Sequence, residues 1–119
     1  MPFLTELKLR PSDGDKWRLL DHLVYETNDG DLVVVPPSFP TDLASIPRPL
    51  RLLYPVHGAH TRAAVIHDYL YHTKEIDDDP ITRKEADQIF YEAMRWLGVR
   101  WSKAKTIYFA VRIGGWASW

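Results

Sequence analysis

A histidine and an aspartate stand side by side in the middle of an apolar and aromatic stretch, residues 63–71. If this stretch is a helix, His67 and Tyr71 lie one turn apart on the same face, and Asp68 is turned away by about 100°. A stretch this apolar should be largely buried, and a buried carboxylate is costly unless it is paired or bound to a metal. The pair therefore predicts a polar site inside the core.

A second acidic residue, Asp87, lies at the edge of the apolar stripe of a later predicted helix. A connection of about ten residues favours antiparallel packing of the two helices, so Asp87 could reach His67 and orient its ring. Asp42 and Asp68 would then be acceptors or metal ligands, and Tyr71 a hydroxyl donor. Carboxylates, an imidazole and a phenol on one wall predict a hydrolytic or metal site.

The same residues also allow a structural interpretation. A network of histidine, aspartate and tyrosine can fasten a proline-rich loop to two helices. Arg48, Arg62 and Arg83 could neutralise the carboxylates without any metal. Exposure distinguishes the two interpretations, because a catalytic His67 should open onto a cleft and a structural one should be sealed from solvent.

Other polar groups carry weaker signals. A zinc set drawn from the histidines has poor spacing and no cysteine to support it, and the acidic run 77–79 lacks the glycine and glutamate of a calcium loop. A basic patch lies beside Trp96 and Trp101 and could face nucleic acid, but it fits a protein partner better. The zinc set is His57, His60, His67 and His72, and the basic patch is Arg95, Arg100, Lys103, Lys105 and Arg112.

The bulk composition limits the classes of function. The length of 119 residues fits one domain, and the net charge of -1 gives no general attraction to nucleic acid or to an anionic membrane. There is no cysteine, which excludes disulfides and thiolate catalysis. We expect no signal peptide, because the first residues lack a basic start and an apolar run. We also expect no membrane span, because no stretch approaches the roughly 18 apolar residues that a span needs.

The pattern of the chain predicts an α+β domain. Residues 1–36 read as an antiparallel β-meander with strands at 3–9, 16–26 and 31–35 and a hairpin turn at 28–30. Residues 37–58 form a proline-rich loop with no long regular element. Residues 59–115 should hold three helices: one from 59 to about 72, one that begins at the capping box of Thr82 and Glu85, and one capped by Ser102.

Three of these segments resemble a known signature. The motifs TDLASIPR (41–48) and HDYLY (67–71), followed by ADxxF from Ala86 to Phe90, resemble those of a family of unknown function encoded by tailed bacteriophages and by prophages. The resemblance runs from about residue 33 to residue 115 in the same order. It implies a phage origin and a small α+β domain, but no established activity.

The first of the predicted helices is also similar to the catalytic helix of secreted phospholipases A2, which carries His-Asp-x-x-Tyr. This resemblance implies that His67 is the general base, that Asp68 binds calcium, and that Asp87 and Tyr71 support the base. The disulfides and the glycine-rich calcium loop of that family are absent here. The loop around Asp42 would have to replace the calcium loop.

We therefore expect a bacteriophage virion or tail-associated structural or assembly protein, made in the host cytoplasm and carried in the virion tail. Its partners would be other phage structural proteins, bound through Phe3, Trp116, Trp119 and the basic third helix. The alternative is a small phage hydrolase that acts on cell-envelope lipid or peptidoglycan. In that case His67 would be the general base, and Ca²⁺ or another divalent cation could be a cofactor. Neither expectation includes a nucleic-acid partner.

Overall fold

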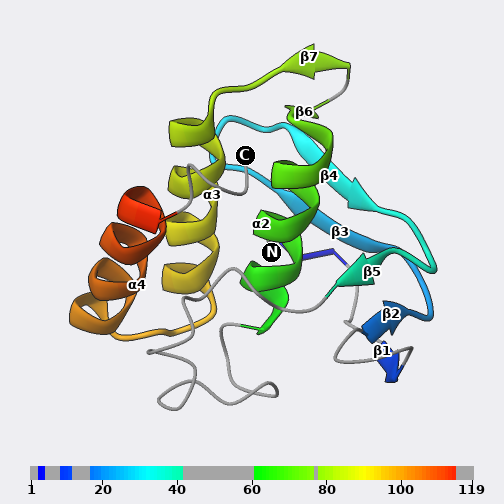
Figure 1. The fold of residues 1–119 in the computed structure, drawn as a ribbon, viewed down its shortest axis with the longest axis horizontal. Helices are drawn as coiled ribbons and strands as arrows, with labels where there is room; N and C mark the ends of the chain where they lie inside the picture. The colour runs from blue at the N-terminus through cyan, green and yellow to red at the C-terminus, as the bar shows by residue number, and fades with distance from the viewer. Residues whose placement is uncertain (1–2, 5–8, 12–16, 42–60, 77, 115–119) are drawn as a thin grey trace.

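The computed structural model describes residues 3–4, 9–11, 17–41, 61–76 and 78–114, and its elements are labelled here as in Figure 1. Short antiparallel strands come first and helices follow, which confirms the expected α+β class. The strands are β1 (Leu9–Pro11), β2 (Trp17–Leu19), β3 (Leu23–Glu26), β4 (Leu32–Val35), β5 (Pro40–Thr41), β6 (Glu75–Ile76) and β7 (Asp79–Pro80). The helices are α2 (Thr61–Thr73), α3 (Arg83–Trp96) and α4 (Trp101–Gly114).

The strand expected over 16–26 is wrong as a single element, because the chain bends at residues 20–22 and forms β2 and β3. In one continuous strand Leu19, Asp21 and Leu23 would share a face. Leu19 and Leu23 are buried, so that face would carry Asp21 into the core. The bend leaves Asp21 exposed, where its carboxylate accepts a hydrogen bond from the backbone N–H of His22.

The bend divides the expected meander between two sheets. β3 and β4 form a hairpin that pairs Leu23 with Val35 and Tyr25 with Val33, and these four side chains face the core. The predicted turn at 28–30 is confirmed, and Gly30 supplies its positive φ of 87°. The other sheet has the order β1-β2-β5.

The proline-rich segment predicted over 37–58 contains β5, a short strand that the sequence did not predict. Pro40 pairs with Arg18 and Thr41 with Trp17 at the edge of the β1-β2-β5 sheet. Proline is tolerated at a sheet edge because the missing N–H is not needed there. The rest of the predicted loop, residues 42–58, lies outside the described residues.

The helices follow the sequence closely. The capping box at α3 is confirmed: the Thr82 hydroxyl accepts from the backbone N–H of Glu85, whose carboxylate accepts from the backbone N–H of Thr82. Gly98 ends this helical segment with a φ of 89°. The start predicted for α4 is wrong by two residues, since the first helical bond runs from the N–H of Ala104 to the carbonyl of Arg100, which leaves Ser102 inside the helix.

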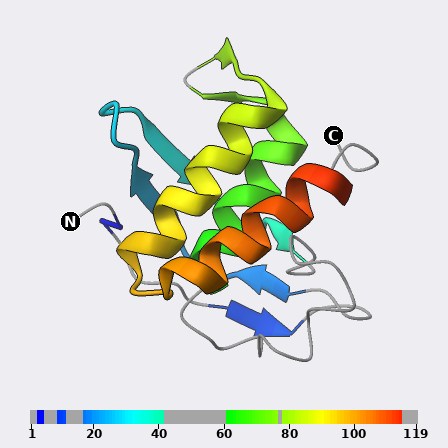
Figure 2. The ribbon, with the colours of Figure 1, turned by 90° about the vertical axis from the view of Figure 1, so that its left-hand side faces the viewer.

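The helix α2 lies between the β3–β4 hairpin and α3, and α4 packs against α3 (Figures 1 and 2). The chain runs upward in α2 and downward in α3 in the view of Figure 1, so the expected antiparallel packing is confirmed. Contacts on both sides explain why α2 is so apolar. Its residues Ala63, Ala64, Val65, Ile66 and Leu70 are all buried.

One local prediction needs correction. Phe3 is buried against Tyr25, with ring centroids 4.7 Å apart, so it does not belong to an exposed aromatic end; Trp116 and Trp119 lie outside the described residues. The acidic connection after α2 contains the paired strands β6 and β7. None of the helices in the described part of the chain is long and apolar enough to cross a membrane.

Candidate functional site

Helix α2 places His67 and Tyr71 on its side facing α3, one turn apart as predicted. The His67 ring is stacked on Phe90 of α3, with centroids 4.5 Å apart and an interplanar angle of 22°. The Tyr71 ring lies 4.2 Å from the His67 ring. Only 2% of His67 is exposed, so the imidazole is enclosed by aromatic and aliphatic side chains.

Helix α3 supplies Asp87, which is fully buried and accepts hydrogen bonds at both carboxylate oxygens. Its Oδ1 lies 2.7 Å from Nε2 of His67 and accepts from the Tyr71 hydroxyl at 2.6 Å. Its Oδ2 accepts from Nη1 of Arg112 at 2.9 Å and lies 3.5 Å from Nη1 of Arg83. These five residues are called the Asp87 cluster below.

The cluster joins three helices, because Arg112 comes from α4. Arg83 strengthens the junction: its guanidinium also donates to the carbonyls of Val111 and Arg112, at 3.3 and 3.2 Å. Those carbonyls lie in the last turn of α4, where backbone acceptors have no partner within the helix and a cation is favoured. Asp87 is therefore the point at which α2, α3 and α4 are held together.

The environment sets the protonation states of the cluster. Burial alone would raise the pKa of Asp87, but hydrogen bonds from His67, Tyr71 and Arg112 outweigh it and hold the pKa below 3.8, its ordinary value. Burial lowers the pKa of His67 below its ordinary 6.5, although Asp87 opposes this shift. Burial and the bond to Asp87 raise the pKa of Tyr71. Near neutral pH a carboxylate thus meets a neutral imidazole, and Nε2 must carry the proton that it donates to Asp87.

The structure brings together three of the predicted site residues, His67, Tyr71 and Asp87. The predicted contact between Asp87 and His67 is confirmed, whereas their catalytic role stays a prediction. Asp68 is half-buried on another side of α2, where its negative charge opposes the lowering of the His67 pKa by burial, and Asp42 lies outside the described residues. In the described part of the chain, no group of three or more His, Cys, Asp or Glu side chains is placed to hold a metal ion.

The sequence did not assign Arg112 to this site but to a basic surface patch. Arg95, from the same patch, is also engaged, because its guanidinium donates to the carbonyl of Val99 at 2.9 Å. Arg83 neutralises the carboxylate as expected. Arg62 does not, since its guanidinium lies over the Phe3 ring, 5.9 Å from the centroid. The signal for Arg112 was its place at the edge of the buried side of α4, about 80° around the helix from the buried Ala104.

The fold and the site define a small α+β domain whose three helices are joined through a buried cluster of histidine, tyrosine, aspartate and arginine. The chain belongs to the family described as "Protein of unknown function (DUF1353)", whose model matches residues 17–111. An uncharacterized protein of Sinorhizobium fredii (strain NBRC 101917 / NGR234) is 39% identical over 83 residues, which are 68% of this chain and 23% of that relative. The chain thus matches less than a quarter of the length of this curated relative. No solved structure matches it.

Proposed function

We propose that this protein is a structural or assembly component of a bacteriophage particle, associated with the tail, and that the Asp87 cluster serves folding rather than catalysis. The phage origin is supported by the motifs around Asp42, His67 and Asp87, which resemble a phage and prophage family. The structural role is supported by one observation above all: Asp87 has no exposed surface, and its oxygens are occupied by four side-chain partners.

A catalytic carboxylate with this environment would have little capacity for chemistry. Two guanidinium groups already compensate its charge, and the His67 side chain that it orients is almost fully enclosed. A buried, fully satisfied polar network rigidifies a small core and fixes how its elements pack. The cluster is therefore better suited to holding α4 in one position than to activating water.

The outer face of α4 supports a role in assembly. Trp101, Phe109 and Ile113 are spaced eight and four residues apart, which places them on one side of the helix, and they are 59%, 56% and 77% exposed. The opposite side of α4 carries the buried Ala104, Ile107 and Val111. A surface helix that is apolar on both sides is unusual, and an exposed apolar stripe indicates a protein interface. We call Trp101, Phe109 and Ile113 the α4 stripe.

The experiment is to follow the chain into phage particles. A host that encodes the protein is induced or infected, and the particles are purified on a density gradient and analysed by mass spectrometry. We expect the wild-type chain in tail-containing fractions and expect Phe109→Ser with Ile113→Ser to remain folded but to be lost from them. Lys84→Ser, an exposed change on α3, is the matched control. Absence of the wild-type chain from purified particles would contradict a virion location.

One observation favours the alternative, a small phage hydrolase acting on cell-envelope lipid or peptidoglycan. His67 binds Asp87 through Nε2, and among the described residues no hydrogen bond engages Nδ1. An imidazole oriented in this way by a carboxylate could take a proton from water at Nδ1. The bonds from His67 and Tyr71 to Asp87 also fit the support that the phospholipase A2 resemblance implies for Asp87.

Calorimetric titration with Ca²⁺ and Zn²⁺ distinguishes this alternative from a structural cluster. The hydrolase hypothesis expects saturable binding in the wild type and its loss in Asp68→Asn. The structural role expects no binding heat in either protein. Binding that survives in Asp68→Asn would remove the metal role assigned to that residue.

A further inference from the structure

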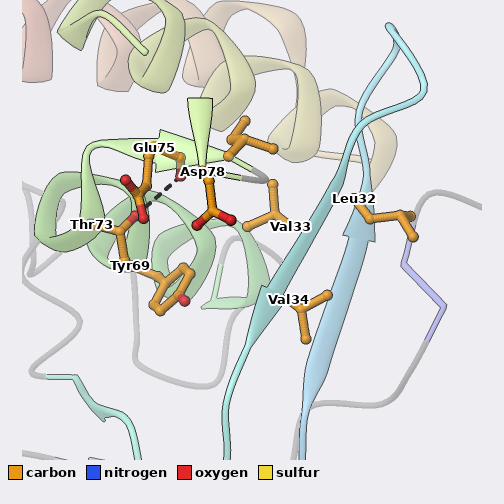
Figure 3. A pocket seen from close by; sticks show the side chains of 8 residues that line it. Leu32, Val33, Val34, Tyr69, Thr73, Glu75 and Asp78 are labelled. Carbon is orange, nitrogen blue, oxygen red and sulfur yellow. Dashed lines mark hydrogen bonds between the residues drawn. The ribbon is translucent and has the colours of Figure 1, made fainter. Parts of the chain in front are cut away.

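A second feature of the molecule, away from the Asp87 cluster, is a pocket of about 280 Å³ beside β4 (Figure 3). Its lining includes three consecutive residues of that strand, Leu32, Val33 and Val34. Side chains of a strand alternate between its two faces, so consecutive residues can line one pocket only where it lies along the edge of the strand. Figure 3 agrees: Val33 points toward Asp78, whereas Leu32 and Val34 lie on the other side of the strand.

The hydrogen-bond pattern shows that this edge is open. The N–H of Thr27 donates to the carbonyl of Asp31, and β3 and β4 pair in regular antiparallel register from there. Bonded and non-bonded pairs alternate along such a ladder, so the backbone N–H and C=O of Leu32 and Val34 point away from β3. Within the described residues, β4 pairs with β3 alone. No hydrogen bond from these residues engages the backbone N–H and C=O groups of Leu32 and Val34.

The opposite wall comes from the end of α2 and the β6–β7 hairpin. Tyr69, Thr73 and the nearly buried Ile76 contribute surface near the strand, and Glu75 and Asp78 are exposed at the rim. The position of Glu75 is fixed, because the Thr73 hydroxyl donates to its backbone carbonyl at 3.2 Å (Figure 3). The turn of the hairpin contains Asp78, whose φ is 66°.

We propose that this groove binds an extended segment of a partner protein that adds as a strand to the edge of β4 and places a lysine or arginine between Glu75 and Asp78. Strand addition satisfies the outward peptide groups of Leu32 and Val34 through main-chain hydrogen bonds. A partner residue opposite Val33 then points its side chain to the same face as Val33, into the pocket. The apolar stem of a basic side chain meets Ile76 and Tyr69, and its charge meets the two carboxylates.

The size of the pocket supports a single side chain as its occupant. At about 280 Å³ it lies below the usual range of small-molecule and cofactor sites, roughly 300–1,000 Å³. The groove is separate from the α4 stripe and does not depend on the proposed role in phage particles. It gives the molecule a second contact surface with a different chemistry.

The test is an NMR titration of the ¹⁵N-labelled full chain with a defined probe, the blocked heptapeptide Thr-Val-Thr-Lys-Thr-Val-Thr. The same peptide with a central Glu is the control. We expect the lysine peptide to shift the amide signals of Leu32 and Val34 and to bind at least about tenfold more tightly than the glutamate peptide. No shift at millimolar lysine peptide, or equal binding of both peptides, would overturn the proposal.

Variants separate the two parts of the recognition. Glu75→Gln with Asp78→Asn removes the charges, and Asn tolerates the positive φ at 78, so the preference for lysine over glutamate should disappear. Val34→Pro removes an N–H that the fold itself does not use, and binding should fall about tenfold or more. Val34→Thr keeps that N–H and should bind like the wild type. If the Val34→Pro protein is folded and still binds normally, strand addition is wrong.

Discussion

At the scale of single residues, Asp87 shows how a buried charge is made tolerable. A carboxylate removed from water loses several kcal/mol of solvation, and only close donors and opposite charges restore it. His67 and Tyr71 serve one oxygen, and Arg112 with Arg83 serves the other. All four partners hydrogen-bond to the Asp87 carboxylate or form an ion pair with it. The loss of this one side chain would therefore remove all of these interactions at once.

Substitution of Asp87 by Asn should therefore be strongly destabilising. The variant keeps the shape but removes the charge, which leaves the Arg112 guanidinium without its counter-ion and turns an acceptor into a donor. We expect the free energy of unfolding to fall by about 3 kcal/mol, measured by urea denaturation. Asp79→Asn, at an exposed position, is the control and should change it by less than about 0.5 kcal/mol. Equal stability of the two variants would contradict the role given to the cluster.

Sequence reasoning reached part of this site for a clear physical reason. Helical periodicity relates His67 to Tyr71, and a short connection between helices makes Asp87 a neighbour of both. Arg112 lies 25 residues beyond Asp87, and its approach depends on how α4 crosses α3. That crossing follows from side-chain packing between two helices, which the pattern of one sequence does not determine.

At the scale of elements, the sequence predicted best where a local hydrogen bond decides the structure. The capping box of Thr82 and the turn that contains Gly30 use only neighbouring residues, and both are confirmed. The break between β2 and β3 depends on which side chains face the core. The apolar residues from 16 to 26 therefore predicted one continuous strand and gave no indication of the break. The same holds for β5, whose partner β2 lies more than twenty residues away.

Besides the packing in the core, the side chain of Glu92 on α3 attaches the β3–β4 hairpin to the helices. One oxygen of Glu92 accepts from the buried Tyr25 hydroxyl at 2.5 Å and from the backbone N–H of Asn28 at 2.9 Å. Burial and the bond to Glu92 raise the pKa of Tyr25, so the phenol stays protonated and remains a donor. Through this contact the turn of the hairpin is attached to the middle of the helical layer.

Tyr25→Phe should loosen the hairpin without unfolding the domain. A hydrogen bond to a charged acceptor is lost while the aromatic ring stays in the core, so we expect a loss of about 2 kcal/mol. Amide hydrogen exchange should rise in β3 and β4 more than in α3 and α4. Tyr91→Phe is a suitable control, because no hydrogen bond of the Tyr91 hydroxyl occurs in the described part of the chain. Uniform faster exchange over all elements would argue against a local attachment.

At the scale of the whole molecule, the helices and the hairpin meet in one core, and titratable groups lie inside it. His67 and Asp87 both have lowered pKa values in the fold. For His67 the unfolded chain takes up a proton near pH 6.5 while the folded chain does not, so acidification favours unfolding below that pH. For Asp87 the stabilisation is complete above about pH 4 and is lost as the pH falls further.

Both shifts have the same sign, so we expect the melting temperature to fall on acidification, first between about pH 7 and pH 5 and again below about pH 4. His67→Gln keeps an N–H for Asp87 but cannot titrate, and it should remove the first of these decreases while leaving the second. NMR of the His67 ring in the wild type gives an independent readout, because the ring should remain neutral in the folded protein at pH 6. A ring that is protonated at that pH, with stability rising on acidification, would mean that His67 and Asp87 form an ion pair. In that case the charge of Asp87 rather than burial would set the pKa of His67, and the cluster would contain a buried ion pair whose imidazolium cannot act as a general base until it loses its proton.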